Sequence, residues 1–177
     1  MGQEAYSPAA ALAASWRMSH AVVAPTPAEG RTDANLAARA QKHLPVMKQA
    51  SALILRDPKH AKAWQILAQA TGQFAAVSAQ RHSYGLWRLA KGIATVGARL
   101  PDQARPQVAE LLRRQLSLLP HYGKAKPEIV EATAAQVLAG WVLLLLKLDR
   151  KGSLARSLLA PIGLDRDDLL PQRLPII

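Results

Sequence analysis

The chain of 177 residues contains no cysteine. This excludes disulfide bonds, thiolate nucleophiles and cysteine-ligated metal sites, and it is compatible with a reducing, cytoplasmic location, which is what we expect. Aromatic residues are also scarce, at 5%, whereas half of all residues are hydrophobic. The core must therefore be built mainly from Leu and Ala. Such a composition favours closely packed helices over sheets rich in Val, Ile and Thr.

Long apolar runs are missing as well. The longest, residues 137–146, lies between Gln136 and Lys147 and is shorter than the roughly 20 residues that cross a bilayer. Near the start of the chain, Arg17 and His20 stand where the apolar run of a secretory signal would continue. We therefore expect neither a secretory signal nor an integral membrane segment.

Acidic residues are few compared with basic ones. The chain has 23 basic and 12 acidic residues, for a net charge of +11. The excess lies in one half: residues 39–126 contain fifteen Lys or Arg and three acidic residues, whereas residues 1–38 carry −1 and residues 127–177 are neutral. A local surplus of this kind attracts polyanions, such as nucleic acid, an anionic membrane or an acidic protein.

Proline, glycine and capping residues divide the chain into helical segments, and no window alternates apolar and polar residues as a half-buried strand would. Pro45 is expected to kink or break its helix, and Gly72 is expected to end one. The pattern predicts helices over residues 8–18, 33–56 with its kink or break at Pro45, 58–70, 73–91, 103–119, 127–148 and 153–159, with 164–170 as a further short candidate. The predicted fold class is all-α, a compact bundle of about six to seven helices.

The expected organisation is a single helical domain over residues 32–170. Its basic part covers residues 39–126 and its neutral part covers residues 127–170. A short helix and linker over residues 1–31 precede this domain, and residues 171–177 form a tail.

Residues 57–68 read Asp-Pro-Lys-His-Ala-Lys-Ala-Trp-Gln-Ile-Leu-Ala. This run resembles the opening of a tetratricopeptide repeat, which places Trp, Leu and a small residue at this spacing. Tyr84 could supply the aromatic of the second helix, but Thr71 and Gln80 depart from the pattern, and no second copy follows about 34 residues later. The resemblance implies one αα-hairpin, a single degenerate repeat, rather than a repeat array.

The segment 73–91 carries the most suggestive group of polar residues. Arg81, Tyr84, Arg88 and Lys91 fall within about 80° of one another on a helical wheel. Cations at this spacing suit a phosphate backbone, and a tyrosine ring can lie on a base or sugar. The alternative is that the cations are ordinary solvated surface and that Tyr84 belongs to the edge of the core.

Two neighbouring predicted helices could extend this surface. Lys59 and Lys62 lie on the polar side of the helix that carries Trp64, and Arg39 and Lys42 lie one helix earlier. Polar helix faces of this type are usually just solvated, and this interpretation stays open for all four residues.

No catalytic pattern accompanies these residues. The five histidines are scattered without metal-ligand spacing, and no motif joins a serine to a histidine and an acid. The three carboxylates Asp165, Asp167 and Asp168 resemble a helix cap and solubilising cluster more than a cation site. We expect a protein that is not an enzyme and that has no metal, no cofactor and no small-molecule substrate.

Two functions fit these observations. The first is a non-catalytic protein that binds RNA or DNA through the phosphate backbone as a subunit of a larger nucleoprotein assembly. The second is a helical adaptor or structural subunit that binds other protein subunits.

Overall fold

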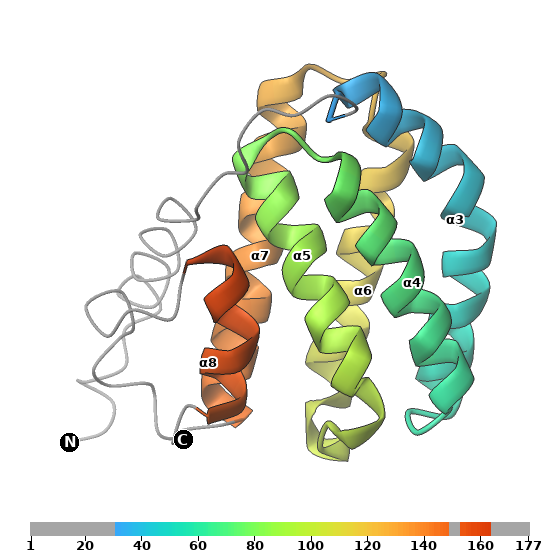
Figure 1. The fold of residues 1–177 in the computed structure, drawn as a ribbon. Coiled ribbons are helices and arrows are strands. Elements are labelled where there is room, and N and C mark those ends of the chain that lie inside the picture. Colours follow the sequence, from blue (N-terminus) through green and yellow to red (C-terminus); the bar gives the residue numbers. More distant parts are fainter. Residues whose placement is uncertain (1–30, 149–152, 164–177) are drawn as a thin grey trace.

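The computed structural model of the protein describes residues 31–148 and 153–163. The predicted N-terminal helix, the possible helix over residues 164–170 and the tail lie outside these residues. The described chain has no strand and confirms the all-α prediction (Figure 1). Its helices are α3 (Asp33–Arg56), α4 (Ala61–Val77), α5 (Arg81–Val96), α6 (Arg105–Leu118), α7 (Pro127–Leu148) and α8 (Ser153–Leu159). Short 3-10 turns lie at η1 (Gly97–Arg99), η2 (Asp102–Ala104), η3 (Leu119–His121) and η4 (Ala160–Ile162).

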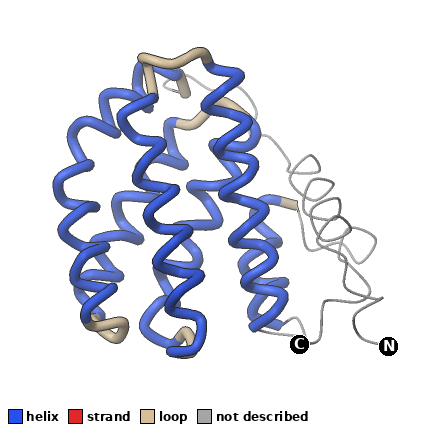
Figure 2. The backbone as a smooth tube through the Cα atoms, turned by 180° about the vertical axis from the view of Figure 1, so that it is seen from behind, coloured by secondary structure: helices blue, strands red, loops and turns tan. Residues whose placement is uncertain are grey.

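The long helices form a closed ring. Helices α3, α4 and α5 run up and down beside one another, and α6 and α7 lie behind them (Figure 1). Figure 2 shows the connections between these helices at the two ends of the bundle. Helix α5 packs on α7, α7 on α6, and α6 on α3, while α8 packs on α5 and α7. All five long helices therefore contribute to one core.

The core is mostly Leu and Ala, as the composition predicts, around a few large aromatic side chains. Phe74 and Trp87 are fully buried, with ring centroids 4.8 Å apart in an edge-on arrangement. The indole nitrogen of buried Trp141 donates a hydrogen bond to Gln115 Oε1 at 3.0 Å. This bond explains why a glutamine lies on the otherwise apolar side of α6, because a buried amide needs a partner.

Local capping decides where the first helices begin. The hydroxyl of Thr32 accepts a hydrogen bond from the Asn35 amide at 3.1 Å and caps α3, in agreement with the sequence. Helix α4 begins at Ala61, three residues later than predicted, because His60 Nδ1 accepts from the Ala63 amide at 3.1 Å and serves as the cap.

Of the kink or break expected at Pro45, the break does not occur, because α3 continues through this residue to Arg56. Leu36 and Ala40 before the proline and Met47 after it are all buried in the same core. Pro45 itself is exposed, on the outer side of a helix that curves around the bundle (Figure 1). Burial on both sides of the proline offsets the one backbone hydrogen bond that it removes.

The predicted helix end at Gly72 is wrong. Helix α4 runs on to Val77, and the turn to α5 comes at residues 78–80. Gly72 stays helical and brings α4 close to α5: a Cβ atom placed there would lie 3.1 Å from Lys91 Cδ. The glycine therefore marks a close helix contact rather than a helix end. The α4–α5 hairpin is present, but its identity as a degenerate repeat stays a prediction.

Helix α7 has the bounds that the sequence predicts. By length and composition it could cross a membrane, but 56% of its most apolar window is buried inside the bundle. Its buried residues include Leu138, Trp141 and Leu145. The described chain has no other helix of this kind. Because α7 packs against α5 and α6, the described residues contain no clear integral membrane segment, as the sequence predicts.

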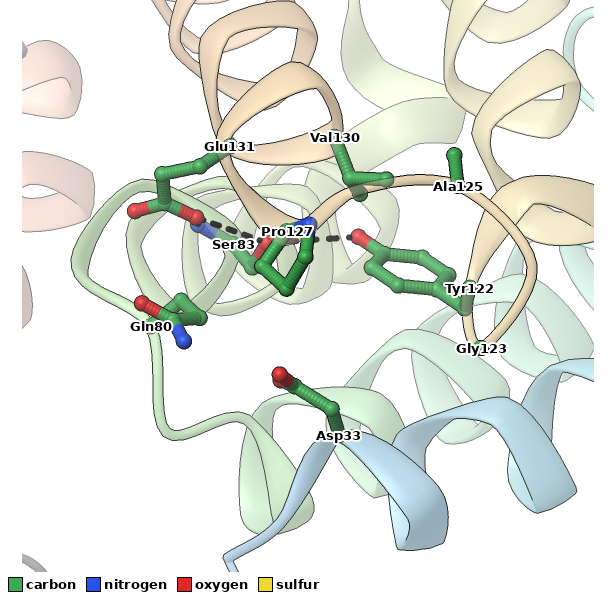
Figure 3. Close-up of a pocket in the computed structure, with 9 residues that line it drawn as sticks. All are labelled: Asp33, Gln80, Ser83, Tyr122, Gly123, Ala125, Pro127, Val130 and Glu131. Atoms are coloured by element: carbon green, nitrogen blue, oxygen red, sulfur yellow. Dashed lines mark hydrogen bonds between the residues drawn. The ribbon is translucent and has the colours of Figure 1, made fainter.

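A carboxylate from α7 holds the first turn of α5 (Figure 3). The backbone amides of His82 and Ser83 both donate to Glu131, the latter at 3.2 Å, and Ser83 Oγ donates at 3.1 Å. Tyr122 is hydrogen-bonded to Ser83 Oγ at 3.5 Å and accepts from the Trp87 indole nitrogen at 2.9 Å. A polar chain thus links α7, the start of α5 and the aromatic core.

Candidate nucleic-acid interface

The four residues singled out on one helical face do share one side of α5. Arg81 and Lys91 are exposed, and Tyr84 and Arg88 are half-buried. The opposite side of α5 is buried, with Leu86, Leu89 and Ile93 among its core residues. The exposed side of this amphipathic helix therefore presents three cations and one aromatic ring over about three turns.

Tyr84 has a cationic neighbour from a distant part of the chain. The guanidinium carbon of Arg31 lies 5.5 Å from the centre of the Tyr84 ring. Arg31 Nη1 also donates to the carbonyls of Ala75, at 3.0 Å, and Ser78, at 3.2 Å. The guanidinium thereby stabilises the carboxyl end of α4 and covers one face of Tyr84, so only the rest of the ring can meet a base or sugar.

Arg39 and Lys91 lie along opposite edges of α4. Arg39 Nη1 donates to Gln73 Oε1 at 2.8 Å, and the methylenes of Lys91 pass over Gly72. These neighbouring α4 residues thus each contact a cationic side chain, one from α3 and one from α5. The outer surface of α3, α4 and α5 therefore joins positions that are far apart in the sequence.

The remaining candidates are more scattered. Lys42 is exposed on α3, about one turn beyond Arg39, while Lys59 lies in the α3–α4 connection and Lys62 in the first turn of α4. Because α4 and α5 run in opposite directions, Lys59 and Lys62 lie at the other end of the bundle from Arg81 (Figure 1). The eight residues thus follow a three-helix surface and do not form a compact cluster.

The α4–α5 hairpin and its flanking turns contain no acidic residue. Residues 58–101 hold six Lys or Arg and not one Asp or Glu. Glu131 of α7 reaches this segment, but through the backbone amides of the first turn of α5. Within the described part of the chain, Lys62, Arg88 and Lys91 have no acidic partner. Their charge is therefore not neutralised by an internal ion pair.

Helix α6 differs from this surface. Glu110 accepts hydrogen bonds from Arg113 at 2.7 Å and from Arg114 at 3.0 Å. These bonds hold the pKa of the exposed Glu110 carboxyl below its usual value and raise the pKa of Arg113. The arginine pair of α6 is thus partly neutralised within its own helix.

The histidines in the described chain have separate structural positions. His43 packs edge-on against Phe74, His60 caps α4, His82 lies beside Glu131, and His121 is exposed. Among the described residues, no group of three His, Asp or Glu could hold a metal ion.

No family model matches the chain, and neither a curated protein nor a solved structure matches it.

Proposed function

We propose that this protein binds nucleic acid, RNA or DNA, through its phosphate backbone and works without catalysis as a subunit of a larger nucleoprotein assembly. The observation that carries the proposal is the acid-free surface of α4 and α5, on which Lys62, Arg88 and Lys91 lack acidic partners in the described chain. An unneutralised basic surface on a rigid helical scaffold attracts a polyanion at long range and then contacts phosphates.

The contacts would be made mainly from α5. Arg88 and Lys91 are one turn apart on its exposed side, and Arg81 lies two turns earlier. Lys62, Lys59, Arg39 and Lys42 would extend the contact along α4 and α3. The uncharged exposed side chains of α4 between them, Gln65 and Gln69, can donate hydrogen bonds to phosphate or sugar oxygens. Such an interface reads little base sequence.

Salt dependence gives the first test. Four phosphate contacts on duplex DNA predict a slope of about −3.6 in a plot of log affinity against log salt, which is an affinity loss of roughly 150-fold between 50 and 200 mM salt. Fluorescence anisotropy with mixed-sequence DNA and RNA would measure it. Absence of binding at low salt would refute the proposed function.

A pair of double variants tests the surface itself. We expect Arg88→Gln with Lys91→Gln to weaken binding and to make the salt slope shallower by about two contacts. The matched control, Arg113→Gln with Arg114→Gln, removes the same charge from α6 on the other side of the bundle and should weaken binding much less. Equal losses in the two variants would show that net charge, and not this surface, drives binding.

The alternative function, a helical adaptor, has one observation in its favour. Ile129 of α7 exposes 59% of its surface, and exposed Ala132 and Gln136 follow on the same side of the helix. This uncharged stripe could meet an apolar surface of another subunit. Analytical ultracentrifugation of wild type and Ile129→Glu with candidate subunits would test whether the stripe is an interface.

A further inference from the structure

The layer of α3, α4 and α5 has acidic residues only at the ends of α3. Residues 34–56 and 58–101 contain no Asp or Glu. Asp33 is the first residue of α3, and Asp57 follows its last residue. The middle of all three helices, and not only of the α4–α5 hairpin, is therefore free of acidic side chains.

Two cations lie at one level on opposite edges of α4. Arg39 of α3 donates to the Gln73 side chain at 2.8 Å. On the other edge, the stem of Lys91 of α5 passes over Gly72. Because Gly72 and Gln73 are consecutive residues of α4, these contacts fix Arg39 and Lys91 at the same height of the layer.

Each of these cations has a second one about one turn away on its own helix. Lys42 follows Arg39 on α3, and Arg88 precedes Lys91 on α5. We call Arg39 and Lys42 the α3 pair, and Arg88 and Lys91 the α5 pair. The two lysines are exposed and the two arginines are half-buried. Within the described chain, none of the four forms an ion pair with an acid.

An uncharged strip of α4 separates the two pairs. It consists of exposed Gln65 and Gln69 and half-buried Gln73, which recur every four residues along the outer side of the helix. Helix α4 packs on α3 at one edge and on α5 at the other (Figure 1). The layer thus presents positive charge on two sides of a neutral centre.

The width of α4 sets the distance between the pairs. Neighbouring helices pack with their axes about 8–10 Å apart, so the axes of α3 and α5 lie about 16–20 Å apart. In a double helix, two rows of phosphates flank each groove, and the major groove of B-DNA is about 12 Å wide. Arg and Lys side chains on flexible stems can lean towards α4 and reach both rows. One strand that runs along α5 meets the α5 pair alone.

The aromatic side chains of the layer are poorly placed for a single strand. Proteins that hold single strands stack the bases on aromatic rings. Trp64, Phe74 and Trp87 are buried. Tyr84 is half-buried, and the Arg31 guanidinium lies 5.5 Å from the centre of its ring. These rings therefore leave little surface on which a base could stack.

We infer that the nucleic acid is double-stranded and lies across the layer, with one phosphate row on the α3 pair and the other on the α5 pair. The inference rests on the proposed function, which leaves the number of strands open. Helix α4 faces the groove between the rows, where its glutamines can donate hydrogen bonds. Phosphate contacts of this kind suit any base sequence. Duplexes of DNA and of RNA both present two phosphate rows, so the experiment includes both.

The first test compares each duplex with its own separate strands, at equal length and equal salt, by fluorescence anisotropy with the full chain. We expect at least one duplex to bind about tenfold or more tightly than either of its strands. Strands that bind as tightly as both duplexes overturn the inference and leave the proposed function standing. Absence of binding to every probe refutes the proposed function itself.

A variant of the α3 pair separates two phosphate rows from the higher charge density of a duplex. Arg39→Gln with Lys42→Gln should weaken the duplex at least about tenfold more than the strand. It should also make the duplex salt slope shallower by about 1.8, the value for two contacts on B-DNA. The α5-pair variant, Arg88→Gln with Lys91→Gln, should weaken both probes. Equal weakening of duplex and strand by the α3-pair variant overturns the inference, because a single row then explains the binding.

Gln73→Met is the control for the hydrogen bond that the α3-pair variant also loses. It removes the acceptor of Arg39 and keeps both cations of the α3 pair, so it should weaken the duplex much less than the double variant does. A loss as large as that of the double variant would show that Arg39 acts by joining α3 to α4. That result would also overturn the inference.

Discussion

At the scale of single residues, the Tyr122 hydroxyl is the acceptor for a buried hydrogen-bond donor in the core. It accepts the buried indole N–H of Trp87 at 2.9 Å. We predict that Tyr122→Phe lowers the free energy of unfolding by about 1–3 kcal/mol, because it leaves this buried donor without an acceptor. Urea denaturation at neutral pH measures the change.

Tyr84→Phe is the matched control for that variant. The half-buried Tyr84 makes its described contact through its ring, with Arg31, and not through its hydroxyl. Loss of the Tyr84 hydroxyl should lower the free energy of unfolding by less than about 0.5 kcal/mol, as for most surface changes. A Tyr122→Phe variant as stable as Tyr84→Phe would contradict the role of the hydroxyl.

The same tyrosine predicts a loss of stability at alkaline pH. Burial raises the pKa of Tyr122 from 10.0 to about 12, so between these values the unfolded chain releases a proton that the folded chain retains. Stability from this group is complete below pH 10 and falls as the pH rises towards 12, by roughly 3 kcal/mol in total. Unfolding of wild type and Tyr122→Phe at pH 8 to 11.5 measures it, and parallel pH curves would contradict it.

Replacement of glycine by alanine should change the stability in opposite directions at Gly97 and Gly72. A Cβ at Gly97 would lie 2.2 Å from the ring of buried Trp64, whose indole nitrogen is held by the Pro58 carbonyl at 2.7 Å. Gly97→Ala should therefore cost about 1–3 kcal/mol or more. At Gly72 the neighbour is the flexible Lys91 stem, and Gly72→Ala should be neutral or stabilise by up to about 1 kcal/mol through helix propensity. Thermal unfolding of both variants measures this contrast, which an equal loss in both would contradict.

At the scale of elements, α5 depends on a cap that comes from another helix. The amides of His82 and Ser83 at its first turn donate to Glu131 of α7. We predict that Glu131→Gln destabilises the protein by about 1–2 kcal/mol, because the charge that favours a helix N-terminus is lost along with part of the cap. Hydrogen exchange of the first amides of α5 should accelerate.

Glu128→Gln provides the control for this variant. Glu128 is exposed in the first turn of α7, and its loss should cost about 0.3–1 kcal/mol through the helix dipole alone. It should leave exchange in α5 unchanged. Equal protection of α5 in wild type and Glu131→Gln would show that the cap is dispensable.

Element positions were predictable where the local sequence dominates. The bounds of α7 follow from Pro127 at its start and the apolar run after it, and the Thr32 cap marks the start of α3. Gly72 was misread as a helix end, and the break allowed for at Pro45 does not occur, because the packing that carries α3 and α4 through these residues is tertiary. Proline removes a helix hydrogen bond and glycine has a low helix propensity, and packing against neighbouring helices offsets both local costs.

At the scale of the whole molecule, the charge surplus should oppose folding. Lys62, Arg88 and Lys91 lack acidic partners in the described chain, and a net charge of +11 repels itself in the compact state. We predict that the thermal midpoint rises as NaCl increases from about 10 to 150 mM, over which the Debye length falls from about 30 to 8 Å. Differential scanning calorimetry measures the midpoint, and one that falls with salt would contradict net repulsion.

The candidate nucleic-acid surface could be predicted in part from the sequence. Spacing along α5 was enough to place Arg81, Tyr84, Arg88 and Lys91 on one side of a helix, because helical periodicity is local. The Arg31 guanidinium on Tyr84 and the link from Arg39 to Gln73 were not predictable, since each joins residues more than thirty positions apart.

The sequence by itself determined the helical class, the cysteine-free Leu and Ala core and the basic middle of the chain, because composition, periodicity and charge belong to the chain. The tertiary structure alone decided which helix ends meet. It brought Asp33, Gln80 and Glu131, which belong to the starts of three helices, around one cavity. Their spacing along the chain carries no periodic signal, and only the closure of the helical ring makes them neighbours.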